Sequence, residues 1–132
     1  MADVFFDTNI LIYLVGNDLQ KADATHKLVG MRGTISVQVL NEATLVARRK
    51  LGFSWEEIDL FLQSIRAKCS VVPLTVATHE RGLTYAARYR LGVYDGMIVA
   101  AAVLAGWTTL YSEDMHDGLV IDGVTVHNPY KA

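Results

Sequence analysis

The chain has 132 residues, of which 52% are hydrophobic and 20% are charged. That length fits one domain, spanning 1–132, around a single hydrophobic core, and the composition excludes intrinsic disorder. With 12 Lys and Arg against 14 Asp and Glu, the net charge is -2, which excludes the uniformly basic surface of a non-specific nucleic-acid binder.

A strand and two helices are predicted at the start of the chain. Val4–Phe6 is an apolar run without polar alternation, typical of a parallel strand covered on both faces. Residues 10–15 then predict a short helix, and Asp18 is a good N-cap for a helix over 19–29. His26 falls on the apolar face of that helix, so we expect it to be buried.

A second strand and two more helices follow. The strand is predicted at 34–37, and apolar residues of 40–51 mark the buried face of the next helix. Ser54 and Glu57 have the spacing of a capping box, in which two side chains satisfy backbone donors at a helix N-terminus. We therefore expect a helix to begin directly after Ser54.

The second half of the chain continues this alternation. Ser70–Leu74 predicts a third strand, and Pro73 near its end indicates an edge of the sheet. A helix is predicted over 75–91, with Gly82 as a weak point, and an almost wholly apolar helix over 95–105. The last two strand candidates are 109–111 and 124–126.

This order of elements predicts an α/β fold. Strands that alternate with helices favour a mainly parallel sheet, here of four to five strands, with helices on both faces. In such sheets, ligands bind beyond the carboxyl ends of the strands, near the point where the strand order reverses. Functional side chains are therefore expected at that edge of the sheet.

Acidic residues are predicted to gather at this edge. They are Asp7 at the end of the first strand, Glu42 shortly after the second, Asp95 at the start of a helix, and Asp114 after the strand at 109–111. Carboxylates crowded together without Lys or Arg repel one another, so a shared pocket is costly unless a cation fills it. Oxygen ligands indicate Mg²⁺ or Mn²⁺ rather than zinc.

These acids stand in motifs that follow one another in a fixed order. The motifs are Asp7-Thr8-Asn9, the segment 36–42, the segment 94–102, and Ser112-Glu113-Asp114. Together they resemble the PIN-domain nucleases, and most closely the VapC-type toxins of toxin–antitoxin pairs. The resemblance covers nearly the whole chain and ends with Asn128-Pro129-Tyr130.

The resemblance implies a three-layer α/β/α sandwich and an endoribonuclease that depends on one or two Mg²⁺ or Mn²⁺ ions. By motif position, the metal-binding and catalytic acids would be Asp7, Glu42, Asp95 and Asp114, with Thr8 and Ser112 as nearby hydroxyls. The resemblance also implies a structured RNA substrate, a homodimer, and a small antitoxin protein as the inhibiting partner.

The last motif departs from the family pattern. The family commonly has Thr, any residue, and then Asp or Asn, whereas Ser112 stands here in place of Thr. Asp117 offers a second acid, three residues after Asp114. Position favours Asp114 as the metal ligand, with Asp117 as an outer-shell ligand. Glu113 is expected to point elsewhere, because neighbouring side chains of an extended segment face opposite sides.

The acids are also compatible with simpler roles and with two other classes of protein. Asp7 could simply cap the helix that follows it, and Asp95 could be the N-cap of its own helix. A haloacid-dehalogenase-type phosphatase also carries an Asp after the first strand, but it expects a second Asp where this chain has Asn9. A non-catalytic module that binds RNA or a partner is the other alternative.

Basic residues form two groups along the chain, at 48–50 and at Arg81, Arg88 and Arg90. Both groups are expected to face solvent, with contact to RNA phosphates as the alternative. A net-acidic protein that binds RNA needs such local positive charge.

Several features favour a cytoplasmic protein without a membrane segment. Met1-Ala2-Asp3 lacks the basic start of a secretion signal. The longest uncharged window, 96–112, is shorter than the roughly 20 apolar residues that span a bilayer. Cys69 is the one cysteine, which excludes an intrachain disulfide and a multi-cysteine metal site.

Overall fold

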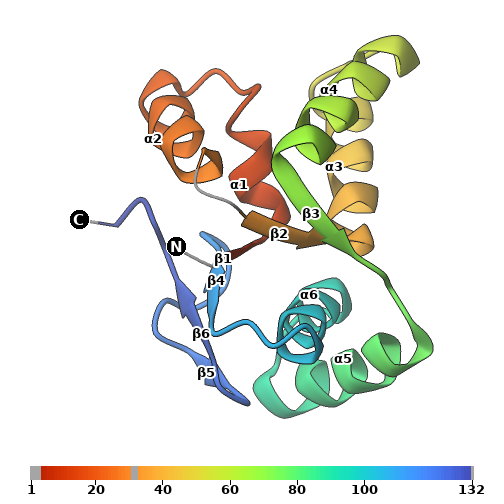
Figure 1. Ribbon diagram of the computed structural model, residues 1–132, viewed down its shortest axis with the longest axis vertical. Coiled ribbons are helices and arrows are strands. Elements are labelled where there is room, and N and C mark those ends of the chain that lie inside the picture. Colours follow the sequence, from red (N-terminus) through yellow and green to blue (C-terminus); the bar gives the residue numbers. More distant parts are fainter. Residues whose placement is uncertain (1–3, 31–32, 132) are drawn as a thin grey trace.

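A central sheet organises the computed structural model, which describes residues 4–30 and 33–131 (Figure 1). Its strands are β1 (Val4–Phe6), β2 (Gly33–Ser36), β3 (Cys69–Val72), β4 (Thr109–Tyr111), β5 (Val120–Ile121) and β6 (Val124–His127). The helices are α1 (Thr8–Ile12), α2 (Leu19–Val29), α3 (Val37–Arg49), α4 (Trp55–Lys68), α5 (Val76–Tyr89) and α6 (Val93–Leu104). The elements therefore alternate along the chain, as the sequence predicts.

The sheet has the strand order β3-β2-β1-β4-β6-β5. Its first five strands in that order run parallel, and β5 pairs with β6 in the antiparallel sense. The chain moves outward from β1 through β2 to β3 and then returns to the other side of β1, where β4 lies. The strand order reverses between β1 and β4, so the carboxyl end of β1 lies at the position where such sheets bind ligands.

Helices cover both faces of the sheet, which confirms the three-layer α/β/α sandwich (Figure 1). Figure 1 shows α1 to α4 on one side and α5 with α6 on the other. This division follows from the preference for right-handed crossovers. The connections from β1 to β2 and from β2 to β3 run in one direction along the sheet, and the connection from β3 to β4 runs in the other, so their helices must lie on opposite faces. The core includes Phe5, Phe6, Ile35 and Leu110, all fully buried.

The hairpin of β5 and β6 adds one strand to the number predicted. Val120–Ile121 is too short to produce a recognisable alternation of apolar and polar residues. The signal that could have revealed it is the turn, because Asp122 and Gly123 both have positive φ, at 45° and 88°. Asp-Gly is a favoured pair in two-residue hairpin turns of this kind.

His26 is exposed, so the prediction that it is buried was wrong. The buried residues of α2 are Thr25 and Val29, and Leu19 is 81% exposed. The apolar spacing of α2 therefore predicted the buried position of Val29 but not those of Leu19 and His26. The other buried residue, Thr25, is polar and hydrogen-bonds the hydroxyl of Tyr130.

Gly82 was predicted to be a weak point of its helix, but the structure shows why a glycine is suited to this position. A Cβ atom built on Gly96 of α6 would lie 2.4 Å from the backbone oxygen of Gly82. A Cβ atom on Gly82 would in turn lie 2.9 Å from the Cα atom of Met97. The backbones of α5 and α6 therefore approach too closely for any side chain at these two positions.

In the ranges 4–30 and 33–131, no helix combines the length and the apolar character needed to cross a membrane.

Replacing Gly96 by alanine should destabilise the protein by about 1–3 kcal/mol, because the added methyl group overpacks the contact between α5 and α6. Thermal unfolding should show a melting temperature several degrees lower than that of the parent. Gly16→Ala is the matched control, since its Cβ atom would lie 3.5 Å from the Ile12 oxygen, an ordinary contact. Equal melting temperatures for the two variants would contradict this packing.

Candidate active site

The carboxyl edge of the sheet holds a cavity of about 280 Å³. Its acidic lining residues are Asp7 after β1, Glu42 on α3, Asp95 on α6 and Asp114 after β4. The remaining lining residues are Thr8, Asn9, Ile12, Tyr13, Val46 and Lys50. The structure thus brings together the four acids that the sequence predicts at this edge.

Asp7 is the buried centre of this cavity, with 2% of its surface exposed. It is the N-cap of α1, and its Oδ1 accepts a hydrogen bond from the backbone N–H of Thr8 at 2.7 Å. Its Oδ2 accepts from the hydroxyl of Ser112 at 2.6 Å and from the side-chain amide of Asn9 at 3.1 Å. Asp7 therefore caps α1 through Oδ1, while Oδ2 faces the side chains of Ser112 and Asn9.

Burial raises the pKa of Asp7 to about 7, from an ordinary value of 3.8. The hydrogen bond from Ser112 acts in the opposite direction, and the negative charges of Asp95 and Glu42 raise the pKa further. Uncompensated negative charge at this point is thus unfavourable, as expected for crowded carboxylates.

The pKa values of Glu42 and Asp95 are also raised, but less than that of Asp7, because both residues are only half-buried. Burial is the main reason that the pKa of each is raised, and the charge of Asp114 contributes to both. The hydroxyl of Thr8 donates to Glu42 at 3.1 Å. Asp95 is not an N-cap, because Gly92 takes that position and Asp95 lies in the first turn of α6.

Asn9 connects two of the acids, a role that the sequence did not reveal. Its Nδ2 donates to Asp7 at 3.1 Å and to Asp114 at 3.0 Å. Its Oδ1 accepts from the backbone N–H of Glu113 at 3.1 Å. The position of Asn9 two residues after Asp7 was visible, but its contact with a residue 105 positions away was not.

Glu113 points away from the cavity, as predicted, and its carboxylate binds Lys21 and Tyr13. Asp117 also lies apart from the four acids, since it is absent from the described cavity lining. It accepts a hydrogen bond from the backbone N–H of Asn128 at 2.8 Å, which is the main reason that its pKa is lowered. The structure therefore brings Asp114, and not Asp117, to the predicted site.

The oxygen donors of the cavity suit a hard divalent cation such as Mg²⁺ or Mn²⁺. In the described part of the chain, no three Asp, Glu, His or Cys side chains are grouped closely enough to enclose a metal ion. Such a cage is not required, because Mg²⁺ usually keeps several waters and uses only one or two protein carboxylates together with substrate phosphates. The residues present therefore fit such a cation.

Positive charge is sparse around these acids. Of the described residues that line the cavity, only Lys50 is basic. Within the same described ranges, no Lys or Arg forms an ion pair with any of the four acids. Hydroxyl and amide groups provide the hydrogen bonds in place of fixed cations.

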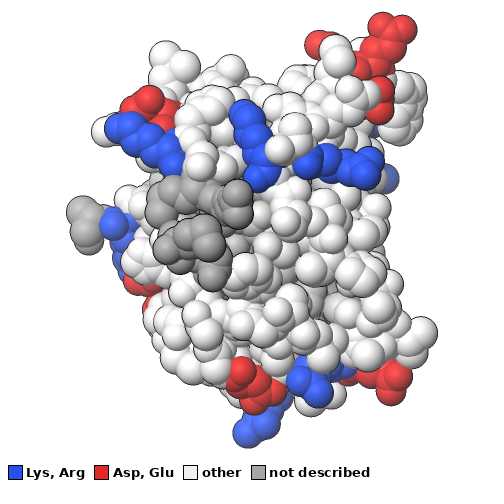
Figure 2. Space-filling model, in the orientation of Figure 1, with Lys and Arg blue, Asp and Glu red and all other residues white. Residues whose placement is uncertain are grey.

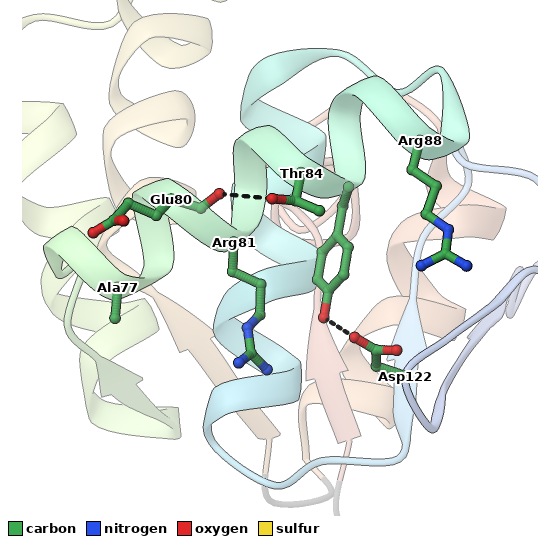
Figure 3. A pocket seen from close by; sticks show the side chains of 7 residues that line it. Ala77, Glu80, Arg81, Thr84, Arg88 and Asp122 are labelled. Atoms are coloured by element: carbon green, nitrogen blue, oxygen red, sulfur yellow. Dashed lines mark hydrogen bonds between the residues drawn. The ribbon is translucent and has the colours of Figure 1, made fainter.

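A larger cavity, of about 480 Å³, lies on α5 and the turn between β5 and β6, away from the four acids (Figure 3). Arg81 and Arg88 line it, as do Glu80 and Asp122. The hydroxyl of Tyr85 donates to Asp122 at 2.5 Å. Charged residues of both signs therefore line this cavity.

Charges of both signs are distributed over the rest of the surface. Figure 2 shows several Lys and Arg groups across the upper part of one face, further Lys and Arg at its lower edge, and Asp and Glu mainly at its edges. The groups Arg48-Arg49-Lys50 and Arg81, Arg88 and Arg90 are exposed, as predicted. The face in view is therefore not uniformly basic, which agrees with the net charge of -2.

The chain belongs to the PIN domain family, whose sequence model it matches over residues 4–116. This match confirms the resemblance that the ordered motifs indicate. A search of curated protein sequences found no match.

Solved structures with the same fold come from toxin–antitoxin systems. A toxin–antitoxin complex from Klebsiella pneumoniae is 22% identical, with a TM-score of 0.73, and covers 98% of this chain and 99% of its own. DNA-bound VapBC from Salmonella typhimurium is 20% identical, with a TM-score of 0.72 and coverage of 98% and 99%. Mycobacterium tuberculosis VapC20, a sarcin-ricin loop cleaving toxin, is 17% identical, with a TM-score of 0.69 and coverage of 84% and 91%.

Asp7 should make the metal-free protein less stable as the pH rises. Its carboxyl keeps a proton up to a pH of about 7 in the folded state but releases it near 3.8 in the unfolded chain. Between these values the folded state binds more protons, so the free energy of unfolding falls with pH. The contribution of Asp7 to stability is therefore fully present below pH 3.8 and is lost as the pH rises through about 7.

Unfolding of the EDTA-treated parent and of Asp7→Asn across this pH range measures the effect. The parent should lose stability relative to the variant by a few kcal/mol, since each pKa unit corresponds to about 1.4 kcal/mol. The test compares how steeply the free energy of unfolding changes with pH, not its absolute value. Asp7→Asn also loses hydrogen bonds, because asparagine cannot accept all those that Asp7 accepts. Asp59→Asn, at an exposed carboxylate of α4, controls for removing one charge. Parallel profiles for the parent and Asp7→Asn would contradict the assigned burial effect.

Proposed function

We propose that the protein is a Mg²⁺- or Mn²⁺-dependent endoribonuclease and the toxin of a type II toxin–antitoxin pair. The observation that carries this proposal is the convergence of Asp7, Glu42, Asp95 and Asp114 on one cavity in a PIN domain. Carboxylates whose pKa values are raised by burial and by one another gain stability when a divalent cation offsets their charge.

One or two of these acids at a time would bind the cation directly, with waters and substrate phosphate completing its coordination, and neighbouring polar groups would orient the carboxylates. The Ser112 hydroxyl and the Asn9 amide both donate to Oδ2 of Asp7, which fixes the direction of that carboxylate. Thr8 does the same for Glu42. When bound, Mg²⁺ or Mn²⁺ would lower the pKa of a water molecule and offset negative charge on the leaving oxygen.

The proposed reaction is hydrolysis of an RNA phosphodiester bond, with water as the nucleophile. The products would carry 5′-phosphate and 3′-hydroxyl ends, because the ribose 2′-OH does not take part. Structured RNA is the proposed substrate class, and the similarity to a sarcin-ricin loop cleaving toxin supports it. Lys50 at the cavity and its exposed neighbours Arg48 and Arg49 supply positive charge that RNA phosphates require.

The proposed partners are a second copy of the chain, forming a homodimer, and a small antitoxin. The cavity supports the antitoxin, because Ile12 and Val46 form an apolar wall beside the acids. A partner could lay an amphipathic segment along that wall and direct a basic side chain toward the carboxylates. The similarity to structures of toxin–antitoxin complexes supports an antitoxin partner.

Asp95→Asn should abolish RNA cleavage, by at least about 100-fold, because it removes one charged oxygen ligand from the cavity. The fold should be preserved, since asparagine has nearly the same shape and Asp95 is half-buried. Cleavage of structured RNA in Mg²⁺, with EDTA as the metal-free control, measures the effect. Asp59→Asn is the matched surface control and should cleave at the parent rate.

Two results would count against the enzyme. Cleavage by Asp95→Asn at the parent rate would contradict the catalytic assignment. A parent protein that binds RNA tightly but does not cut it, at any Mg²⁺ or Mn²⁺ concentration, would favour the alternative of a non-catalytic binding module.

Expression of the chain without its antitoxin should arrest bacterial growth, and expression of Asp95→Asn at the same level should not. Growth curves after induction, with the amounts of protein measured, test the toxin role separately from the chemistry. Normal growth in cells that contain soluble, active parent protein would contradict it.

A further inference from the structure

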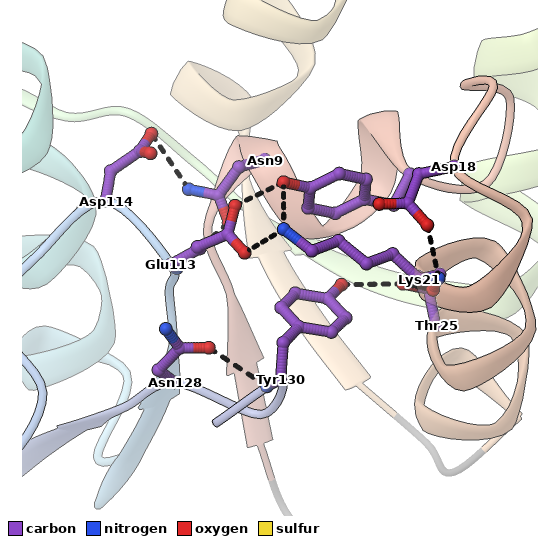
Figure 4. A network of polar contacts seen from close by, with 9 residues as sticks. Asn9, Asp18, Lys21, Thr25, Glu113, Asp114, Asn128 and Tyr130 are labelled. Carbon is purple, nitrogen blue, oxygen red and sulfur yellow. Dashed lines mark hydrogen bonds and ion pairs between the residues drawn. The ribbon is translucent and has the colours of Figure 1, made fainter. Parts of the chain in front are cut away.

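A polar network lies beside the four acids and joins elements that are distant in the sequence (Figure 4). At its centre, Nζ of Lys21 on α2 lies 2.5 Å from Oε2 of Glu113 and donates to the hydroxyl of Tyr13 at 3.1 Å. The Tyr13 hydroxyl donates in turn to the other oxygen of Glu113. Figure 4 shows the amine of Lys21 pointing toward Glu113.

Tyr130, near the C-terminus, packs against Tyr13 and Lys21 and completes this network. The ring of Tyr130 meets the ring of Tyr13 edge-on, with centroids 5.1 Å apart, and Nζ of Lys21 lies 4.7 Å from the Tyr13 centroid and 5.5 Å from that of Tyr130. The hydroxyls of Tyr130 and Thr25 are hydrogen-bonded at 2.6 Å. The ammonium group therefore has an anion and two aromatic rings around it.

Glu113 connects this network to the acids of the cavity. It immediately precedes Asp114, and its backbone N–H donates to Asn9, whose amide also binds Asp114 and Asp7. The segment that carries Asp114 is thus held on both sides. Before Asp114, Glu113 is held by Lys21 through its side chain and by Asn9 through its backbone; after Asp114, the buried Met115 donates its backbone N–H to Ser112 at 3.2 Å. Asp114 itself is exposed, and among the described contacts Asn9 is its hydrogen-bond partner.

The Lys21–Glu113 pair differs from an ordinary surface ion pair. Its side chains are 33% and 24% exposed, whereas those of Lys27 and Asp23, also on α2, are 80% and 76% exposed and 3.7 Å apart. Partial burial reduces screening by solvent, and the tyrosines restrict the geometry of the pair. The Lys27–Asp23 pair therefore offers a control on the same helix.

We propose that Lys21 is a positioning residue that acts through Glu113 to hold Asp114 at the cavity and so sets the metal affinity of the site. This inference rests on the proposed function, because it assigns Asp114 to a metal centre. Lys21 does not touch the cation; it fixes the segment from which one ligand extends. Groups that hydrogen-bond directly to a metal ligand typically change metal affinity by about 10–100-fold, and Lys21 acts one residue further away, so we expect an effect at the lower end of that range.

Binding of Mn²⁺ to the purified protein, followed by the electron paramagnetic resonance signal of the free ion, tests the proposal. Lys21→Met and Glu113→Gln should each weaken binding by about tenfold or more, and their double variant should be no weaker than either alone. Lys21→Arg should restore most of the affinity, and Lys27→Met should bind as the parent does. RNA cleavage by Lys21→Met should recover at saturating Mn²⁺.

Hydrogen exchange of the metal-free proteins gives a second measurement that does not depend on activity. The backbone amides of residues 113–115 should exchange faster in Lys21→Met than in the parent, and those of α6 should not change. Unaltered Mn²⁺ affinity in a folded Lys21→Met protein, or a loss of cleavage that saturating Mn²⁺ does not restore, would overturn the positioning role alone. A parent that binds no Mn²⁺ would overturn the proposed metal centre and this inference with it.

Discussion

The burial of several carboxylates together, with their mutual repulsion, at the carboxyl edge of the sheet is the constraint on which the rest of this site depends. The order β3-β2-β1-β4 places the end of the buried strand β1 beside the end of β4, so Asp7 enters a region with little solvent. Glu42 and Asp95 then approach it from α3 and α6. Burial is the largest cost of ionising these three carboxyl groups, and the negative charges of neighbouring carboxylates add to it.

The protein offsets this repulsion with neutral donors. The Ser112 hydroxyl donates to Asp7, the Thr8 hydroxyl to Glu42, and the Asn9 amide to both Asp7 and Asp114, and no described Lys or Arg forms an ion pair with these acids. A fixed ammonium or guanidinium group would neutralise the carboxylates permanently and compete with a metal ion. Hydroxyls and amides instead orient the carboxylates and leave their charge available. Lys21 does not disturb this arrangement, because its ammonium group pairs with Glu113 outside the cavity and not with the four acids.

The sequence predicted the features that depend on local patterns. Buried strands such as β1 have continuous apolar runs, and the capping box of Ser54 and Glu57 is present at the start of α4. The four acids could be predicted because strand ends converge at one edge of a parallel sheet. The contacts of Asn9 with Asp114 and of Lys21 with Glu113 could not, since they join residues about 100 positions apart. Sequence position already favoured Asp114 over Asp117, and the folded chain brings Asp114 to the cavity.

An anomalous difference map from crystals of the protein soaked in Mn²⁺ would reveal the proposed metal centre. We expect a strong peak in the cavity, within bonding distance of the Asp7 carboxylate and of at least one other among Glu42, Asp95 and Asp114. An open, solvent-accessible cavity without a peak, in crystals where Mn²⁺ binds only elsewhere, would contradict the claim that these acids form a metal centre.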